Sequence, residues 1–300
     1  MTLRDGYVTT DDGLRLFYRR AGDSPEIVLF LNGVTSAEDF APLAVGRSII
    51  FIDPRNRGWS DAVSDPSQIE RGIHHDVDDL DAFRRHFGVD RVDIIGFSYA
   101  SVSAALYAMQ HAAHTRRVVL LGAMAPDQRT QYAPSLSNVD DTLQQALAAL
   151  GELMKEQSTL DPIEFCRRFW AVLNPIYVVD PADVSKLTFA RCDSANERNF
   201  MPTWVGHILP SIQKLTLTED DFARATAPVL VVHGTKDRSG PYGAGRDWAR
   251  LLPNARLVTI DNAAHVPWIE APDLVFGSLA TFLAGEWPAR AESIAALEIS

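Results

Sequence analysis

The chain has 300 residues, of which 46% are hydrophobic and 22% are charged, and its formal net charge at pH 7 is -11. These proportions are typical of a soluble globular protein, and the length suits one compact unit with a sizeable core. The acidic charge, which no cluster of Lys or Arg offsets, argues against binding to nucleic acid or to an anionic membrane. We therefore expect a small-molecule partner.

The N-terminal segment and the cysteines bear on the compartment. Residues 1–17 contain Asp, Arg and Gly throughout, so they lack the apolar core of a secretory signal, and no apolar run reaches the length that spans a membrane. Cys166 and Cys192 are the only cysteines. So few thiols favour a reducing cytoplasm. We expect a cytoplasmic protein with two buried free thiols, although these cysteines could pair.

The predicted elements begin with a hairpin and continue as strands that alternate with helices. Residues 6–9 and 14–19, around the turn Asp11-Asp12-Gly13, predict an antiparallel hairpin. Short apolar runs rich in β-branched residues then predict buried parallel strands. They are residues 27–31, 48–52, 92–95, 117–121, 229–232 and 256–260. Helical patterns lie between them, so the sequence predicts an α/β fold, a mostly parallel sheet with helices on both faces and ligands at the carboxyl ends of the strands.

The alternation stops after Leu121, and residues 122–228 separate two predicted strands. This gap is too long for a loop and contains helical patterns at 139–155 and 162–173. We expect an inserted helical cap at 125–226, with residues 1–124 and 227–300 forming the core. Most aromatic side chains of the cap are expected to pack in its own small core and a few to line a substrate cavity. They are Phe165, Phe169, Trp170, Tyr177, Phe189, Phe200 and Trp204. No individual substrate-binding residue is predicted.

Ser98 is the candidate nucleophile. Gly-x-Ser occurs four times, but only Gly96-Phe97-Ser98 follows a strand pattern and opens a helix pattern. In that context a sharp turn lifts the serine hydroxyl above the sheet. Gly96 and Ala100, on either side, would let the two backbones approach closely. The alternative is a serine that merely caps the helix.

A serine hydroxyl needs a base and a group that orients the base. Asp237 follows the strand at 229–232, and His265 follows the strand at 256–260. The chain order Ser98, Asp237, His265 is that of the α/β-hydrolase triad. Asp261 lies closer to His265 in sequence and is the alternative orienting group, while His233 is expected to be structural.

These placements resemble those of the α/β-hydrolase fold superfamily, in its esterase, lipase and proline-iminopeptidase-like group with a helical cap. The matching stretches are FLNGV, DPRNRGWSD, GFSYAS, HGTKD and AAHVPWIEAP. The resemblance implies that the backbone N–H groups of Val34 and Tyr99 form the oxyanion hole. The chain departs from the family in two places. Asn32-Gly33 stands where His-Gly is usual, and Ala100 replaces the usual Gly two residues after the nucleophile.

The sequence therefore predicts a serine hydrolase that cleaves a small carboxylic ester or lactone. A non-hydrolytic or C–C bond-cleaving enzyme of the same fold, an aminopeptidase-like amidase and a ligand-binding receptor are the alternatives. Neither a cofactor nor a metal is predicted, since no dinucleotide motif or ligand cluster is present, and a homodimer is possible. The charged side chains of DPRNRGWSD are expected to be structural. The acidic run Asp76, Asp78, Asp79 and Asp81 is expected to be a solvated helix face.

Overall fold

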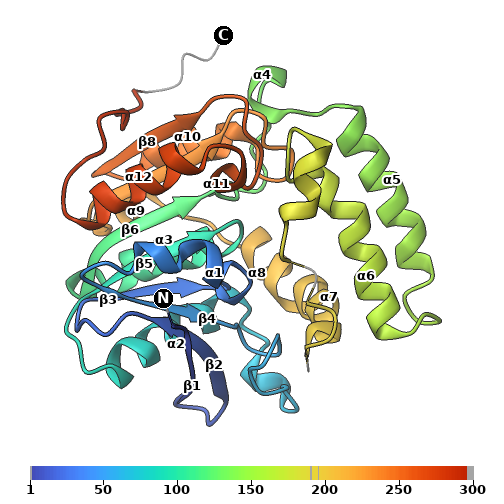
Figure 1. The fold of residues 1–300 in the computed structure, drawn as a ribbon, viewed down its shortest axis with the longest axis horizontal. Coiled ribbons are helices and arrows are strands. Elements are labelled where there is room, and N and C mark those ends of the chain that lie inside the picture. The colour runs from blue at the N-terminus through green and yellow to red at the C-terminus, as the bar shows by residue number, and fades with distance from the viewer. Residues whose placement is uncertain (1, 190, 195, 296–300) are drawn as a thin grey trace.

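The computed structural model describes residues 2–189, 191–194 and 196–295. Within them, eight strands form one sheet in the order β1-β2-β4-β3-β5-β6-β7-β8 (Figure 1). β1 pairs antiparallel with β2, β2 pairs antiparallel with β4, and the remaining neighbours are parallel. The strands are β1 (Arg4–Thr9), β2 (Arg15–Ala21), β3 (Ile27–Leu31), β4 (Ser48–Ile52), β5 (Val92–Phe97), β6 (Thr115–Leu121), β7 (Val229–Gly234) and β8 (Ala255–Ile260).

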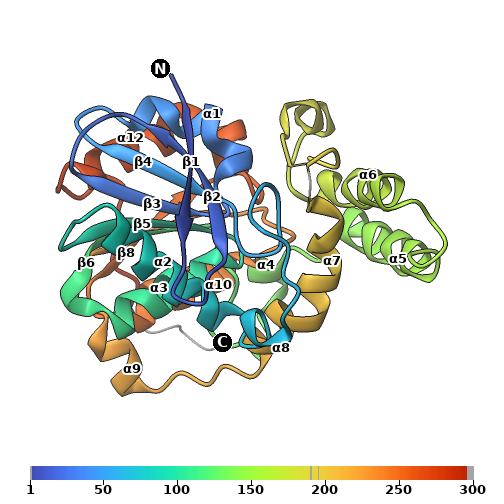
Figure 2. The same cartoon turned by 90° about the horizontal axis from the view of Figure 1, so that it is seen from below.

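Helices cover both faces of this sheet (Figure 2). One face carries α2 (Ile73–His86), α3 (Ala100–Gln110), α9 (Glu219–Arg224) and α10 (Tyr242–Leu251), and the other carries α1 (Ala37–Phe40) and α12 (Pro272–Leu283). The sequence of β3 is an unbroken apolar run because the strand is buried on both faces. Leu29 packs into the first core, whereas Val28 and Phe30 pack into the second. A strand buried on both faces has no position for a polar residue. The predicted α/β fold class is confirmed.

The segment between β6 and β7 is helical and packs in two parts. α5 (Asp141–Lys155) and α6 (Pro162–Leu173) lie side by side, away from the sheet (Figures 1 and 2). α8 (Leu209–Gln213) and α9 return to the core, where Ser211 Oγ accepts a hydrogen bond from the Ile73 N–H. The shorter elements are α4 (Pro134–Ser137), α7 (Phe200–Thr203) and a π-helical turn, Trp204–Ile208.

The two cysteines form a disulfide, so the expectation of free thiols is wrong. Cys166 in α6 bonds to Cys192, and their Cα atoms are 5.6 Å apart, a normal separation for a disulfide. Cysteine count alone could not show that the backbone between β6 and β7 brings these thiols together. The cytoplasmic expectation therefore loses its support from free thiols. None of the described helices is long and apolar enough to cross a membrane.

The acidic run on α2 is not uniformly solvated. Asp76 and Asp79 are 3% and 2% exposed, whereas Asp78 faces solvent. Ser103 Oγ donates a 2.7 Å hydrogen bond to Asp76, and Arg55 donates two hydrogen bonds to Asp79 at 2.6 and 2.8 Å. The expectation of a solvated face is therefore wrong for these two residues, because the helix turns them toward partners on other elements.

Candidate active site

Ser98 lies at a sharp turn between β5 and α3. Its φ of 56° is in the left-handed region, which non-glycine residues seldom occupy. The neighbouring backbones approach closely, since a Cβ on Gly96 would lie 2.4 Å from the Ala100 carbonyl oxygen. The Ser98 N–H donates to the Leu121 carbonyl of β6 at 2.9 Å, and this bond holds the turn at the carboxyl edge of the sheet. Such a strained strand-to-helix turn is what a nucleophile elbow requires.

Asp237 and His265 meet at the same edge of the sheet. Their side chains are 0% and 1% exposed, and His265 Nδ1 donates to Asp237 Oδ2 at 2.8 Å. The N–H groups of Ser239 and Gly240 each donate to Asp237 Oδ1 at 2.8 Å. Although burial acts to raise the pKa of Asp237, the charge of His265 and hydrogen bonds from His233 and His265 outweigh it and hold that pKa well below its usual range. Asp261, the alternative partner, is exposed.

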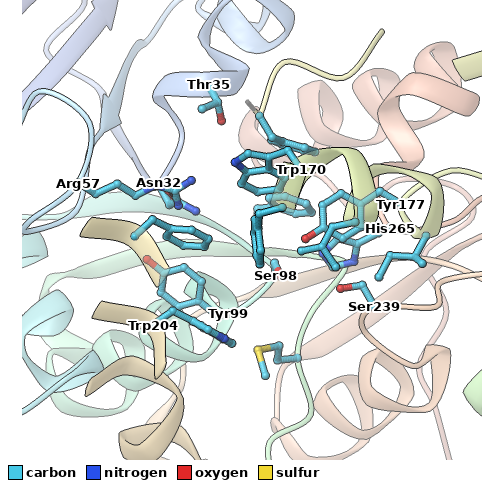
Figure 3. A pocket seen from close by; sticks show the side chains of 17 residues that line it. Asn32, Thr35, Arg57, Ser98, Tyr99, Trp170, Tyr177, Trp204, Ser239 and His265 are labelled. Carbon is cyan, nitrogen blue, oxygen red and sulfur yellow. Dashed lines mark hydrogen bonds between the residues drawn. The ribbon is translucent and has the colours of Figure 1, made fainter. Parts of the chain in front are cut away.

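The position of the proton on His265 follows from these contacts. A carboxylate only accepts, so Nδ1 carries a hydrogen, and when the ring is neutral its lone pair is therefore on Nε2. Nε2 is buried and has no hydrogen-bond partner among the described residues, and Ser98 lines the same cavity as His265 (Figure 3). His265 is therefore in the tautomer that can take a proton from a hydroxyl group in this cavity.

His233 also contacts the buried carboxylate of Asp237. Its Nε2 lies 2.8 Å from the Gly240 carbonyl oxygen and 3.2 Å from Asp237 Oδ2. Both atoms accept, so Nε2 is the donor, while the buried Nδ1 finds no partner in the described chain. His233 thus supports Asp237 without lining the cavity.

An aromatic cavity of about 210 Å³ lies over Ser98. Six of the seven aromatics considered from the sequence line it, more than the few that were expected, and the same rings also pack against one another in a hydrophobic cluster. They are Phe169, Trp170, Tyr177, Phe189, Phe200 and Trp204. Phe97 from β5 completes this ring, and its centroid lies 4.8 Å from that of His265. The spacing of aromatic residues in the sequence does not show which of them face a cavity, because the cavity is enclosed by several elements.

The two residues proposed for the oxyanion hole are placed differently. Tyr99 follows the nucleophile at the N-terminus of α3 and lines the cavity. Val34 opens a 3₁₀ turn, Val34–Ser36, and is buried, but it does not line the cavity. From this loop, Asn32 and Thr35 reach the cavity instead.

Arg57 also lines the cavity and was missed as a site residue. Arg57 Nη2 lies 3.1 Å from Glu197 Oε1, in the segment between β6 and β7, and both side chains are buried. Arg57 therefore ties loops together, as the sequence analysis expected of its motif, and it also places a cation at the cavity wall. Nothing in the motif distinguishes it from Arg55, which bonds to Asp79 away from the cavity.

No group of three or more His, Cys, Asp or Glu side chains within the described ranges is arranged to hold a metal ion.

Comparison with known proteins shows the family and the fold of the chain. The alpha/beta hydrolase fold family profile matches residues 28–272. The chain is 26% identical over 285 residues to "Proline iminopeptidase PfmaB" of Pestalotiopsis fici, covering 91% of this chain and 97% of that one. It is 24% identical over 273 residues to the 2-hydroxymuconate semialdehyde hydrolase of Pseudomonas putida, covering 85% and 86%.

Solved structures share the fold. An esterase from Exiguobacterium antarcticum superposes with a TM-score of 0.70 at 17% identity and covers 93% of this chain and 99% of its own. A meta-cleavage product hydrolase from Pseudomonas fluorescens gives 0.69 at 16% identity and covers 93% and 97%. The resemblance inferred from the sequence motifs is confirmed at the level of the superfamily, and the chain belongs to the alpha/beta hydrolase fold family.

Proposed function

We propose that the protein is a serine hydrolase that cleaves a small carboxylic ester or a lactone through an acyl-enzyme on Ser98. One observation carries the proposal. The strained turn at Ser98 opens into the same cavity as His265, whose Nδ1 donates to the buried carboxylate of Asp237. This arrangement contains a nucleophile, a base in the required tautomer and an orienting group.

The reaction would proceed in two halves. His265 Nε2 takes the proton of Ser98 as Oγ attacks the carbonyl carbon, and Asp237 stabilises the imidazolium that forms. The oxygen that becomes negative would be bound by backbone N–H groups. Tyr99, at the start of α3, lines the cavity, whereas Val34, the second donor that the family resemblance implies, does not. His265 then protonates the leaving alcohol, and afterwards it activates the water that releases the acid.

The cavity favours substrates with an apolar group. Its walls are mainly aromatic, and its volume is about 210 Å³. Small pockets of this kind bind ligands by burying apolar surface and use a few polar groups to orient them. We therefore propose an ester or lactone with a compact apolar or aromatic substituent, bound without a cofactor.

The proposal is tested with short and medium p-nitrophenyl esters and a fluorophosphonate probe. The wild type should give a burst of p-nitrophenol and a probe adduct whose mass maps to Ser98. Ser98→Ala should lose both while it retains the wild-type melting temperature. If the folded wild type gives neither turnover nor an adduct, the proposal is wrong.

Hydrolysis of a C–C bond is the second candidate. Arg57 adds a cationic side chain to a cavity whose wall is largely apolar, and such a group suits a substrate that carries a carboxylate near the bond to be cleaved. The relative from Pseudomonas putida named above is a 2-hydroxymuconate semialdehyde hydrolase. Turnover of 2-hydroxymuconate semialdehyde that exceeds the best ester turnover and disappears in Ser98→Ala would favour this candidate.

A further inference from the structure

Asn32 is a polar residue of the cavity to which the reaction above assigns no role. It directly follows β3, whose last residue, Leu31, is in register with Gly96 of the neighbouring strand β5. This register places Asn32 beside the turn that carries Ser98. Figure 3 shows the Asn32 side chain on the side of Ser98 that Tyr99 occupies, opposite His265.

The backbone at Asn32 is held in one conformation. Its φ is 58°, a left-handed value that asparagine tolerates better than most residues. The next N–H, that of Gly33, lies 3.2 Å from the carbonyl oxygens of both Phe30 and Ile52. A Cβ on Gly33 would lie 2.6 Å from the Phe30 ring, so this close approach of the loop to β3 requires glycine at position 33.

Arg57 determines which way the amide of Asn32 faces. Arg57 Nη1 donates to Asn32 Oδ1 at 2.8 Å. A guanidinium only donates, so the oxygen of the amide must face Arg57 and the Nδ2 hydrogens must point elsewhere. Within the described residues, no acceptor is paired with Nδ2, and Asn32 lines the cavity.

We propose that Asn32 Nδ2 donates a hydrogen bond to the oxygen that becomes negative when Ser98 attacks, and that Arg57 is the positioning residue for this donor. The inference rests on the proposed hydrolytic function and adds a side-chain donor to its oxyanion hole. It also gives a role to the first residue of Asn32-Gly33, where the sequence departs from the family pattern.

The surroundings of Arg57 strengthen this donor. Arg57 is itself buried, its charge is balanced by Glu197, and its guanidinium lies 4.0 Å from the centroid of the Phe200 ring. A cation that bonds to an amide oxygen draws electrons from the amide, so its N–H groups become better donors. The fixed geometry also means that little reorganisation is needed as charge develops on the substrate.

Two substitutions of Asn32 test the role of its side-chain amide separately from the role of its left-handed backbone conformation. Asn32→Gly keeps the left-handed turn and removes the amide, whereas Asn32→Asp keeps an acceptor for Arg57 and removes the N–H donors. Asn262→Gly is the matched control, because Asn262 also has a left-handed φ, 54°, and is exposed. The measurements are kcat and KM for a p-nitrophenyl ester, and Ki for an alkyl trifluoromethyl ketone, which forms a tetrahedral oxyanion with a serine.

We expect both Asn32 variants to lose about 100-fold in kcat with KM changed by less than about threefold, as for a donor that acts mainly in the transition state. The Ki of the ketone should rise by a similar factor, and the control should match the wild type. An Asn32→Gly variant that retains wild-type kcat and Ki would overturn the inference while leaving labelled Ser98, and hence the proposed function, intact. A folded wild type that the fluorophosphonate does not label would overturn both.

A double-mutant cycle tests the role of Arg57. Arg57→Lys keeps a positive charge but cannot make the same set of hydrogen bonds. If Arg57 acts through Asn32, Arg57→Lys should raise the Ki of the ketone in the wild-type background and change it little in the Asn32→Gly background. Equal effects in the two backgrounds would show that Arg57 does not position this donor.

Discussion

Asp237→Asn is the sharpest test of the catalytic arrangement, because the structure fixes how the new amide must lie. The N–H groups of Ser239 and Gly240 both donate to Oδ1, so the amide oxygen must stay at that position. The NH₂ group then takes the position of Oδ2, 2.8 Å from His265 Nδ1, and it can only donate. His265 must therefore accept at Nδ1 and carry its proton on Nε2. In that tautomer it cannot take the proton of Ser98.

The expected loss is large because the wrong tautomer removes the base without removing the side chain. A wrongly protonated imidazole lowers kcat of a triad enzyme by about 10⁴. At about 1.36 kcal/mol for each factor of ten, this loss raises the barrier by about 5.5 kcal/mol. The assay is kcat/KM on a p-nitrophenyl ester together with the rate of fluorophosphonate labelling, both at pH 7. Asp261→Asn, at the exposed carboxylate near His265, is the control. The reasoning is refuted if Asp237→Asn keeps a tenth of the activity, or if Asp261→Asn loses as much.

Three further predictions concern stability. Gly96→Ala should destabilise the folded protein by at least about 1–3 kcal/mol, because the new Cβ would lie 2.4 Å from the Ala100 carbonyl oxygen. Gly151→Ala, which has open space around it in helix α5, should stabilise the protein by about 0.5–1 kcal/mol. The urea midpoints of the two variants test both predictions. Burial raises the pKa of Asp76 to about 7, so the folded state binds an extra proton between about pH 4 and 7 and loses stability as pH rises through that window. Asp76→Asn should remove up to about 4 kcal/mol of this dependence, and equal pH slopes in urea titrations of the two proteins would contradict the assignment. The Cys166–Cys192 disulfide, which spans 26 residues, should contribute about 3.5 kcal/mol to the free energy of unfolding by restricting the unfolded chain. Cys166→Ser should therefore lower the urea midpoint. Dithiothreitol should lower the midpoint of the wild type and leave that of the variant unchanged.

The sequence predicted those parts of the molecule that depend on neighbouring residues in the chain. Each strand and each candidate catalytic residue carries a local signal, either an apolar run or a polar residue just after one. Such a signal places Ser98, Asp237 and His265 at one edge of the sheet, because the carboxyl ends of parallel strands meet there. The hydrogen bond between His265 and Asp237 rather than Asp261 needed coordinates, since it depends on how the two loops fold toward each other.

The features that sequence reasoning missed arise from contacts between distant residues. Asp76 and Asp79 lie in an acidic run that looks solvated, yet Ser103 and Arg55 pair with them. The pairing of the two cysteines depends on the fold of the cap in the same way. The spacing of residues along one helix or strand cannot show such pairings, because the two partners belong to different elements.

Contacts between residues far apart in the sequence also hold the walls of the cavity in place. On one side of the cavity, Arg238 directly follows Asp237 in sequence. Its Nε lies 2.7 Å from Oδ2 of Asp140, which belongs to the segment between β6 and β7. On the other side, the pair Arg57 and Glu197 joins residues 140 positions apart and holds Asn32. The segment between β6 and β7 is therefore attached to the loops that carry Asp237 and Asn32. A substitution that shifts the cap will move the aromatic wall and these loops together, so variation in the cap should alter kcat as well as KM.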